Sequence, residues 1–219
     1  MAHYLILGAG KFGRLALERL RAQDEQAQFL VADWNARVLR AQGLDVSGVQ
    51  GVEAEAVAFL AESLREGAAG DWIIPAIPEH VAFSWLRQGP LAGTGWEVLE
   101  VPAEPATLTP VAVRGREGEL YLSRARHLCP DDCSEPPVCP VTGEPRETPL
   151  YEELAALEVP GFKTAVIPSL QLAPGVGGFP PGRLLALAQN LAGLRGKVLV
   201  ATACRCHGVV HALERRSRG

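Results

Sequence analysis

The sequence lacks any apolar run that reaches the ~18 residues needed to cross a bilayer, so we expect a protein that is not an integral membrane protein. It also lacks a basic leader with a cleavage site, because its start reads Met1-Ala-His-Tyr-Leu-Ile-Leu-Gly8. Both absences predict a cytoplasmic protein. Thiols stay reduced in that compartment, so the five cysteines are expected to be metal ligands or redox groups rather than disulfides.

The chain has little net charge and no common catalytic pattern. Its formal charge of -4 gives no electrostatic reason to expect nucleic acid or an anionic membrane as a partner. No Walker loop, Ser-His-Asp arrangement or internal repeat is evident in the sequence. No residue therefore stands out as a general acid or base, and the function must be sought in other motifs.

The first 101 residues alternate between strand-like and helix-like segments. Short apolar runs predict strands, and apolar residues spaced along one helical face predict the helices between them. The strands are expected at 4–7, 29–32, 72–77 and 97–101, and the helices at 11–22, 34–42, 54–65 and 79–87. This order predicts an α/β domain, residues 1–101, with a parallel sheet and helices on both faces.

A glycine motif lies directly after the first predicted strand. Gly8, Gly10 and Gly13 have the G-x-G-x-x-G spacing, and Asp33 follows Gly13 by 20 residues at the end of the next strand. Gly8 permits a tight turn, Gly10 lets a pyrophosphate approach the backbone, and Gly13 lets the helix pack on the strand. The helix N-terminus favours an anion, and Asp33 can accept hydrogen bonds from ribose hydroxyls.

These features predict a Rossmann-type domain that binds NAD(H). The residues expected to contact the dinucleotide are Gly8, Gly10, Lys11, Phe12, Gly13 and Asp33. The alternative is a glycine-rich turn that binds no ligand.

The segments Tyr4-Leu-Ile-Leu-Gly-Ala-Gly-Lys-Phe-Gly-Arg14 and Val31-Ala-Asp33 carry a family resemblance. They resemble the nucleotide-binding domain of TrkA-type potassium-uptake regulators and the saccharopine-dehydrogenase-like Rossmann group. The resemblance covers roughly the first 80 residues and is specific to the fold rather than to a reaction. It implies an NAD-binding domain at the start of the chain.

The remaining residues, 102–219, have a different character. A hairpin is expected over 111–114 and 119–126, and six prolines predict an irregular segment over 130–149. A short helix at 151–157, strands at 163–167 and 197–202, and a helix at 183–194 are expected to follow. Together they predict a smaller α+β region that contains all the cysteines.

The five cysteines lie in two short groups, which scattered core cysteines would rarely do. Cys129, Cys133 and Cys139 lie on the irregular segment, and Cys204 and Cys206 follow the last predicted strand. All five are candidate ligands of a metal or cluster, whereas a redox thiol relay and inert thiols are the alternatives.

The spacing of these cysteines does not match the usual zinc patterns. A proline follows Cys129 and Cys139, as in ferredoxin-type runs, although the ferredoxin spacing differs. Three thiolates from the first group and one from Cys204 or Cys206 would suffice for a [4Fe–4S] cluster, which we favour over zinc. His127 and His207 are either structural histidines, ligands or hydrogen-bond donors to the ligands.

Three functions stay open at this level. The first is a redox protein that couples NAD(H) to an iron–sulfur centre. The second is a non-catalytic, nucleotide-sensing regulator of the potassium-transport type with a structural metal. The third is an NAD-dependent dehydrogenase with a structural zinc. Besides the dinucleotide, an electron-transfer or transporter partner protein and a homo-oligomer remain open.

Overall fold

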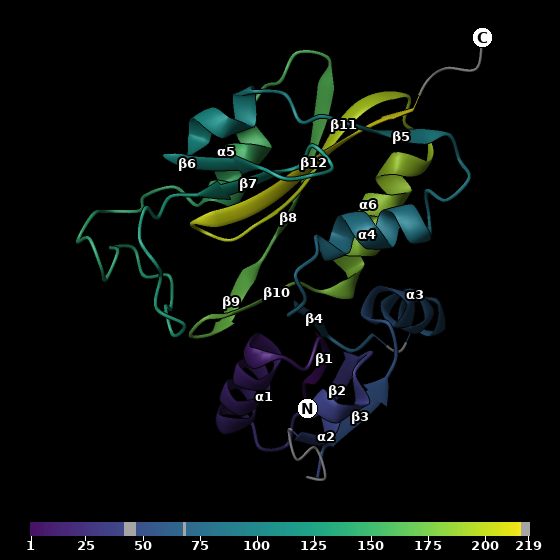
Figure 1. Ribbon diagram of the computed structural model, residues 1–219, viewed down its shortest axis with the longest axis vertical. Helices are drawn as coiled ribbons and strands as arrows, with labels where there is room; N and C mark the ends of the chain where they lie inside the picture. Colours follow the sequence, from purple (N-terminus) through teal and green to yellow (C-terminus); the bar gives the residue numbers. More distant parts are fainter. Residues whose placement is uncertain (42–46, 68, 216–219) are drawn as a thin grey trace. The chain divides into compact units, whose positions relative to one another are not determined.

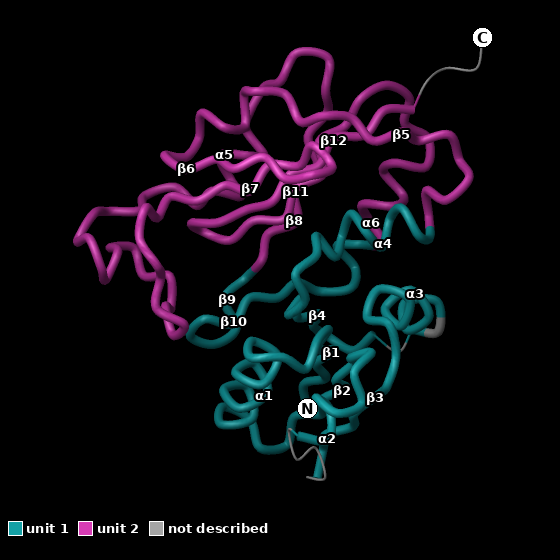
Figure 2. The backbone as a smooth tube through the Cα atoms, viewed as in Figure 1, with its two compact units in different colours: residues 1–89, 170–184 teal, residues 90–169, 185–219 magenta. Residues whose placement is uncertain are grey.

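The computed structural model describes residues 1–41, 47–67 and 69–215 (Figure 1). The chain divides into two compact units (Figure 2): unit 1 contains residues 1–89 and 170–184, and unit 2 contains residues 90–169 and 185–219. Within the described ranges, none of the helices combines the length and apolar character that a membrane span requires.

Unit 1 is built on a sheet of four parallel strands in the order β3-β2-β1-β4. The strands are β1 (His3–Leu7), β2 (Gln28–Asp33), β3 (Val49–Glu53) and β4 (Trp72–Pro75). The helices are α1 (Lys11–Gln23), α2 (Ala36–Ala41), α3 (Ala56–Glu66) and α4 (Val81–Gln88). The predicted alternation of strand and helix is therefore confirmed, and the sheet is parallel as expected.

Apolar side chains cover both faces of this sheet. Ile6 of β1 belongs to a buried cluster that includes Leu17 of α1 and Leu39 of α2. Leu5 and Leu7 alternate with Ile6, are also buried, and face the other way. The helix α3 contacts β1 and β2 on that opposite side (Figure 1). The carboxyl ends of the strands therefore meet at one edge of a sheet that is covered on both sides.

A hairpin from a distant part of the chain completes unit 1. The strands β9 (Leu170–Ala173) and β10 (Val176–Gly178) are antiparallel, and the backbones of Ile73 and Phe179 exchange hydrogen bonds of 2.9 and 3.0 Å. The side chain of Phe179 is fully buried. The hairpin is a separate two-stranded sheet that an isolated bridge links to β4, and residues 170–184 join the unit that was expected to end at residue 101.

Unit 2 contains a mixed sheet in the order β6-β7-β12-β11-β8, with β5 also paired to β12. Only β8 and β11 are parallel neighbours. The strands are β5 (Trp96–Leu99), β6 (Val111–Arg114), β7 (Leu120–Ser123), β8 (Phe162–Pro168), β11 (Gly196–Ala203) and β12 (His207–Arg215). The helical elements of unit 2 are the 3-10 turn η1 (Glu104–Leu108) and α5 (Leu150–Ala156). The helix α6 (Pro181–Ala192) begins in unit 1 and continues in unit 2 from residue 185.

The strand predicted at 97–101 is present as β5, but it joins the second sheet rather than the parallel one. The boundary expected at residue 101 therefore differs from the compact units, and unit 2 is not the smaller of the two. The reason is that a local apolar pattern indicates a strand without indicating its partner, and here β5 pairs with a strand more than a hundred residues later. The α5 helix packs Leu150 and Leu154 into the core of this second sheet.

Candidate functional site

The glycine loop lies at the carboxyl end of β1, the edge where open α/β sheets bind ligands. Gly8 has a φ of +103°, and a Cβ there would lie 2.7 Å from the Ala76 carbonyl oxygen. A Cβ at Gly13 would lie 1.9 Å from the Gly8 carbonyl oxygen. These two positions therefore require glycine to fold the loop, whatever the loop binds.

Gly10 differs from the other two glycines because a Cβ there would meet nothing within 4 Å. Its φ of -70° and ψ of -161° are open to any residue, so neither its backbone conformation nor the packing requires a glycine. Gly10 is the N-cap of α1 and provides no side-chain cap, and the next two residues, Lys11 and Phe12, are exposed. In dinucleotide-binding domains, the second glycine of this motif lets a pyrophosphate approach the backbone.

Asp33 ends β2 beside this loop, as the sequence predicts. Its Oδ2 accepts a 2.7 Å hydrogen bond from the Ala9 N–H, and its Oδ1 accepts a 2.8 Å bond from the Asn35 N–H. The first of these contacts fixes the glycine loop to β2 and was not predicted. A carboxylate has about four acceptor positions, so Asp33 can still accept bonds from ribose hydroxyls. The exposed Trp34 follows it directly and lies at the same edge.

The two cysteine groups come together in unit 2, at the turn between β11 and β12. The Arg124 N–H donates to the Cys206 carbonyl at 2.9 Å, and the Leu150 N–H donates to the Arg205 carbonyl at 3.0 Å. Arg205 also donates to Glu135 Oε2 at 3.2 Å and to the Arg146 carbonyl at 2.8 Å. These bonds hold the irregular segment from Arg124 to Leu150 against the turn that carries Cys204 and Cys206.

Cys139 lies at a tight turn within the irregular segment. Its N–H donates to the Glu144 carbonyl, and its carbonyl accepts from the Gly143 N–H, both at 2.8 Å. Hydrogen bonds to the sulfur from the side chains of Thr142 and Arg146, and from the Thr142 backbone, lower the pKa of the Cys139 thiol to about 6. The turn therefore stabilises a thiolate at a buried position.

Arg146 supplies the positive charge of this cluster and is itself buried. Its side chain hydrogen-bonds to Cys139, and its Nη1 lies 4.0 Å from Cys133 Sγ. Although burial opposes the effect, these sulfur contacts raise the pKa of Arg146 above its usual value. Arg146 was not predicted from the sequence, although it is the only Lys or Arg within residues 129–149, a segment with five acidic residues.

His207, the first residue of β12, connects the two cysteine groups. Its Nε2 lies 3.7 Å from Cys129 Sγ, and its Nδ1 lies 3.9 Å from Cys204 Sγ. The His207 N–H also donates to Cys204 Sγ at 3.4 Å. Burial, and then the charge of Glu135 and a hydrogen bond to its side chain, raise the pKa of Cys204 to about 12. Cys204 is thus held as a protonated thiol, unlike Cys139.

All five cysteines that the sequence predicts as ligands lie within the described residues, and none of them forms a disulfide. Across residues 1–41, 47–67 and 69–215, no three His, Cys, Asp or Glu side chains are grouped closely enough to hold a metal ion as they are placed. One nitrogen of this neighbourhood stands out, because His127 Nε2 is buried without a hydrogen-bond partner among the described residues. Its ring lies close enough to His207 to act on it electrostatically.

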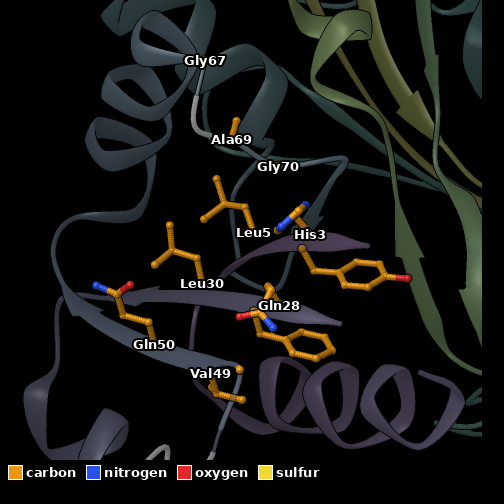
Figure 3. Close-up of a pocket in the computed structure, with 12 residues that line it drawn as sticks. His3, Leu5, Gln28, Leu30, Val49, Gln50, Gly67, Ala69 and Gly70 are labelled. Carbon is orange, nitrogen blue, oxygen red and sulfur yellow. The ribbon is translucent and has the colours of Figure 1, made fainter. Parts of the chain in front are cut away.

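A pocket of about 500 Å³ lies elsewhere in unit 1, at the amino ends of the strands (Figure 3). It is lined by the first residues of β1, β2 and β3 and by backbone around Gly70. Ligands of open α/β sheets bind at the opposite, carboxyl edge, and the pocket contains none of the predicted site residues. It is therefore not our candidate site.

Comparison with known proteins identifies relatives without assigning an activity to them. Residues 69–216 match a protein family described as "Uncharacterized protein, C-terminal domain". A protein of Archaeoglobus fulgidus, named "Uncharacterized protein", is 32% identical over 219 residues, which cover 96% of this chain and 99% of the relative. No solved structure was found to match the chain.

Proposed function

The chain belongs to this family, and since the family description names no activity, we propose a function from the two sites: a redox protein that binds NAD(H) in unit 1 and holds a cysteine-ligated metal centre in unit 2. NAD(H) would supply hydride transfer, and an iron–sulfur cluster would supply one-electron transfer. The pairing of a two-electron carrier with a one-electron centre accounts for both motifs in one chain.

The observation that carries the dinucleotide half is the contrast among the three glycines. Gly8 and Gly13 are required by the fold, whereas Gly10 faces open space and has an ordinary backbone conformation. A ligand that must approach the backbone explains a glycine at position 10. The strand order β3-β2-β1-β4, with Asp33 at the end of β2, is that of a Rossmann-type half-domain and supports the same proposal.

The observation that supports the metal half is the chemistry of the donors. Five thiols and two imidazoles suit zinc and iron–sulfur centres, which prefer soft sulfur and nitrogen ligands. The unpaired His127 Nε2 would gain a partner from a metal or from one of its ligands. As the described residues are placed, these donors are not grouped to hold an ion, so a bound metal would require some of them to move.

Two measurements test this function. Calorimetric titration should show tighter binding of NAD(H) than of NADP(H), because Asp33 repels a 2′-phosphate; equal or reversed affinities would contradict the assignment. Protein purified without oxygen from iron-replete cells should contain iron and acid-labile sulfide and should oxidise NADH with an artificial acceptor. Stoichiometric zinc without sulfide, or NADH binding without turnover, would favour the regulator or the zinc-containing dehydrogenase.

A further inference from the structure

The five cysteines of unit 2 are not equivalent, and their contacts separate them. Cys129 Sγ faces His207 Nε2 at 3.7 Å. Two ligands of one tetrahedral zinc ion, a thiolate and an imidazole nitrogen, lie ~3.5 Å apart when the metal–ligand bonds have their usual lengths. The pair Cys129 and His207 is therefore within a few tenths of an ångström of the separation that a shared metal imposes.

Cys204 also lies close to the His207 ring, but its sulfur is already engaged in hydrogen bonds that hold the turn. Its sulfur already accepts the His207 N–H at 3.4 Å and hydrogen-bonds to the side chain of Glu135. The Cys204 N–H in turn donates to the His207 carbonyl at 2.8 Å, which closes the tight turn between β11 and β12. This sulfur has structural partners, and it stands on the Nδ1 side of the ring rather than on the Nε2 side.

A histidine that binds a metal through one ring nitrogen usually donates its other N–H to a fixed acceptor, which sets the orientation of the ring. Cys204 Sγ occupies the place of that acceptor, 3.9 Å from His207 Nδ1. His207 as a residue is exposed, although its ring is partly buried by its neighbours, which lowers the pKa of the imidazole.

We propose that the metal centre is a mixed imidazole–thiolate site, in which Cys129 Sγ and His207 Nε2 bind the metal while Cys204 positions the His207 ring and is not a ligand. This inference rests on the metal half of the proposed function. It replaces an all-cysteine ligand set with a mixed one, and it chooses between the two cysteines of the C-terminal pair, leaving Cys206 as the thiol that can join the ligands. A nitrogen ligand in place of a thiolate makes the reduction potential of an iron–sulfur centre more positive.

The test uses the full-length protein, reduced and freed of metal, and then loaded with zinc or, separately, with iron and sulfide. X-ray absorption at the metal edge should show both nitrogen and sulfur neighbours, at about 2.0–2.1 Å and 2.3 Å for zinc. A shell of four sulfurs would overturn the proposal. If the wild type binds neither zinc nor iron, the metal half of the proposed function fails instead, whereas the NAD(H) titration is unaffected by either result.

Matched variants separate ligands from positioning residues. His207→Ala should lose the nitrogen contribution and bind metal at least tenfold more weakly, and His207→Cys should restore tight binding with an all-sulfur shell. Cys129→Ser should weaken binding as strongly as His207→Ala, whereas Cys204→Ser should keep the metal stoichiometry. His3 is an exposed histidine of unit 1, and the variant His3→Ala serves as the control.

The results that contradict the proposal are equally specific. Loss of metal from Cys204→Ser with retention in Cys129→Ser would mean that Cys204, and not Cys129, is the ligand. An unchanged X-ray absorption spectrum in His207→Ala would exclude His207 as a ligand. If His207→Ala does not fold by circular dichroism, His207→Cys decides alone, because a nitrogen contribution that persists in that variant excludes His207 as its source.

Discussion

At the scale of single residues, two glycines of the loop have different roles: Gly13 is needed for folding, and Gly10 is proposed to be needed for binding. A methyl group at Gly13 would collide with the Gly8 carbonyl, whereas one at Gly10 would meet nothing. We therefore expect Gly13→Ala to destabilise the protein by ~1–3 kcal/mol through overpacking. Gly10→Ala should lower the free energy of unfolding by less, ~1 kcal/mol or below, because the added methyl group meets nothing but alanine is a poorer N-cap than glycine.

The same pair of variants tests the dinucleotide site. Gly10→Ala should fold normally and bind NADH at least tenfold more weakly, because the methyl group occupies the space of the pyrophosphate. Thermal unfolding and calorimetric titration give the two quantities. Wild-type affinity in Gly10→Ala would mean that any dinucleotide binds away from this loop.

The contrast between Cys139 and Cys204 predicts two opposite dependences of stability on pH in the reduced, metal-free protein. The pKa of Cys139 falls from 9.0 to about 6 on folding, so the unfolded chain binds more protons between these values. The stabilisation from Cys139 is complete above pH 9 and is lost as the pH falls through 6. The difference in Tm between wild type and Cys139→Ser should therefore grow from pH 6 to pH 9.

Cys204 provides the matched control because the sign is reversed. Folding raises its pKa from 9.0 to about 12, so its contribution is present below pH 9 and is lost as the pH rises toward 12. The difference in Tm between wild type and Cys204→Ser should stay constant from pH 6 to pH 8 and change only in more alkaline solution. A pH-independent difference for Cys139→Ser would show that its sulfur is not a stabilised thiolate.

At the scale of secondary-structure elements, Phe179 directly after β10 connects the β9–β10 hairpin to β4 of unit 1. Phe179 is fully buried beside β4, so Phe179→Ala should cost ~3–5 kcal/mol, the usual range for a large aromatic side chain in a core. Leu170→Ala in the same hairpin should cost less than ~1 kcal/mol because 38% of Leu170 is exposed. Denaturant unfolding measures both, and equal costs would contradict the role assigned to Phe179.

The elements that the sequence predicts are those with a local signal. The strand at residues 4–7 and the helix from Lys11 have apolar periodicity and a glycine motif between them, and both are present. The hairpin was not predicted, because β10 has only three residues and two of them are glycines. The strand β3 was not predicted either, since Val49-Gln-Gly-Val-Glu53 has no apolar run and is a strand only through pairing with β2.

At the scale of the whole molecule, the contacts that could not be predicted are those between segments far apart in the sequence. The grouping of the cysteines is visible in the sequence because each group is short, and the structure places the two groups together through bonds such as Arg124 to Cys206. Their charged neighbours, Arg146 and Glu135, were not predicted as partners of the thiols, because those contacts depend on how an irregular segment folds. For the same reason the sequence could not assign residues 170–184 to unit 1.

The division into two units predicts where each ligand acts. Each unit has its own apolar cluster, and the glycine loop and the cysteines belong to different units. A ligand that binds only the folded state slows the opening of the structure around its site. In hydrogen–deuterium exchange, saturating NADH should therefore protect the segment from Gly8 through α1 and the end of β2, and should leave residues 124–149 unchanged.

Removal of metal from the loaded protein should increase exchange over 124–149 and around the β11–β12 turn, with no change in α1. Protection of the cysteine segment by NADH, or increased exchange in α1 after metal removal, would instead mean that binding at one site is coupled to the stability of the other unit.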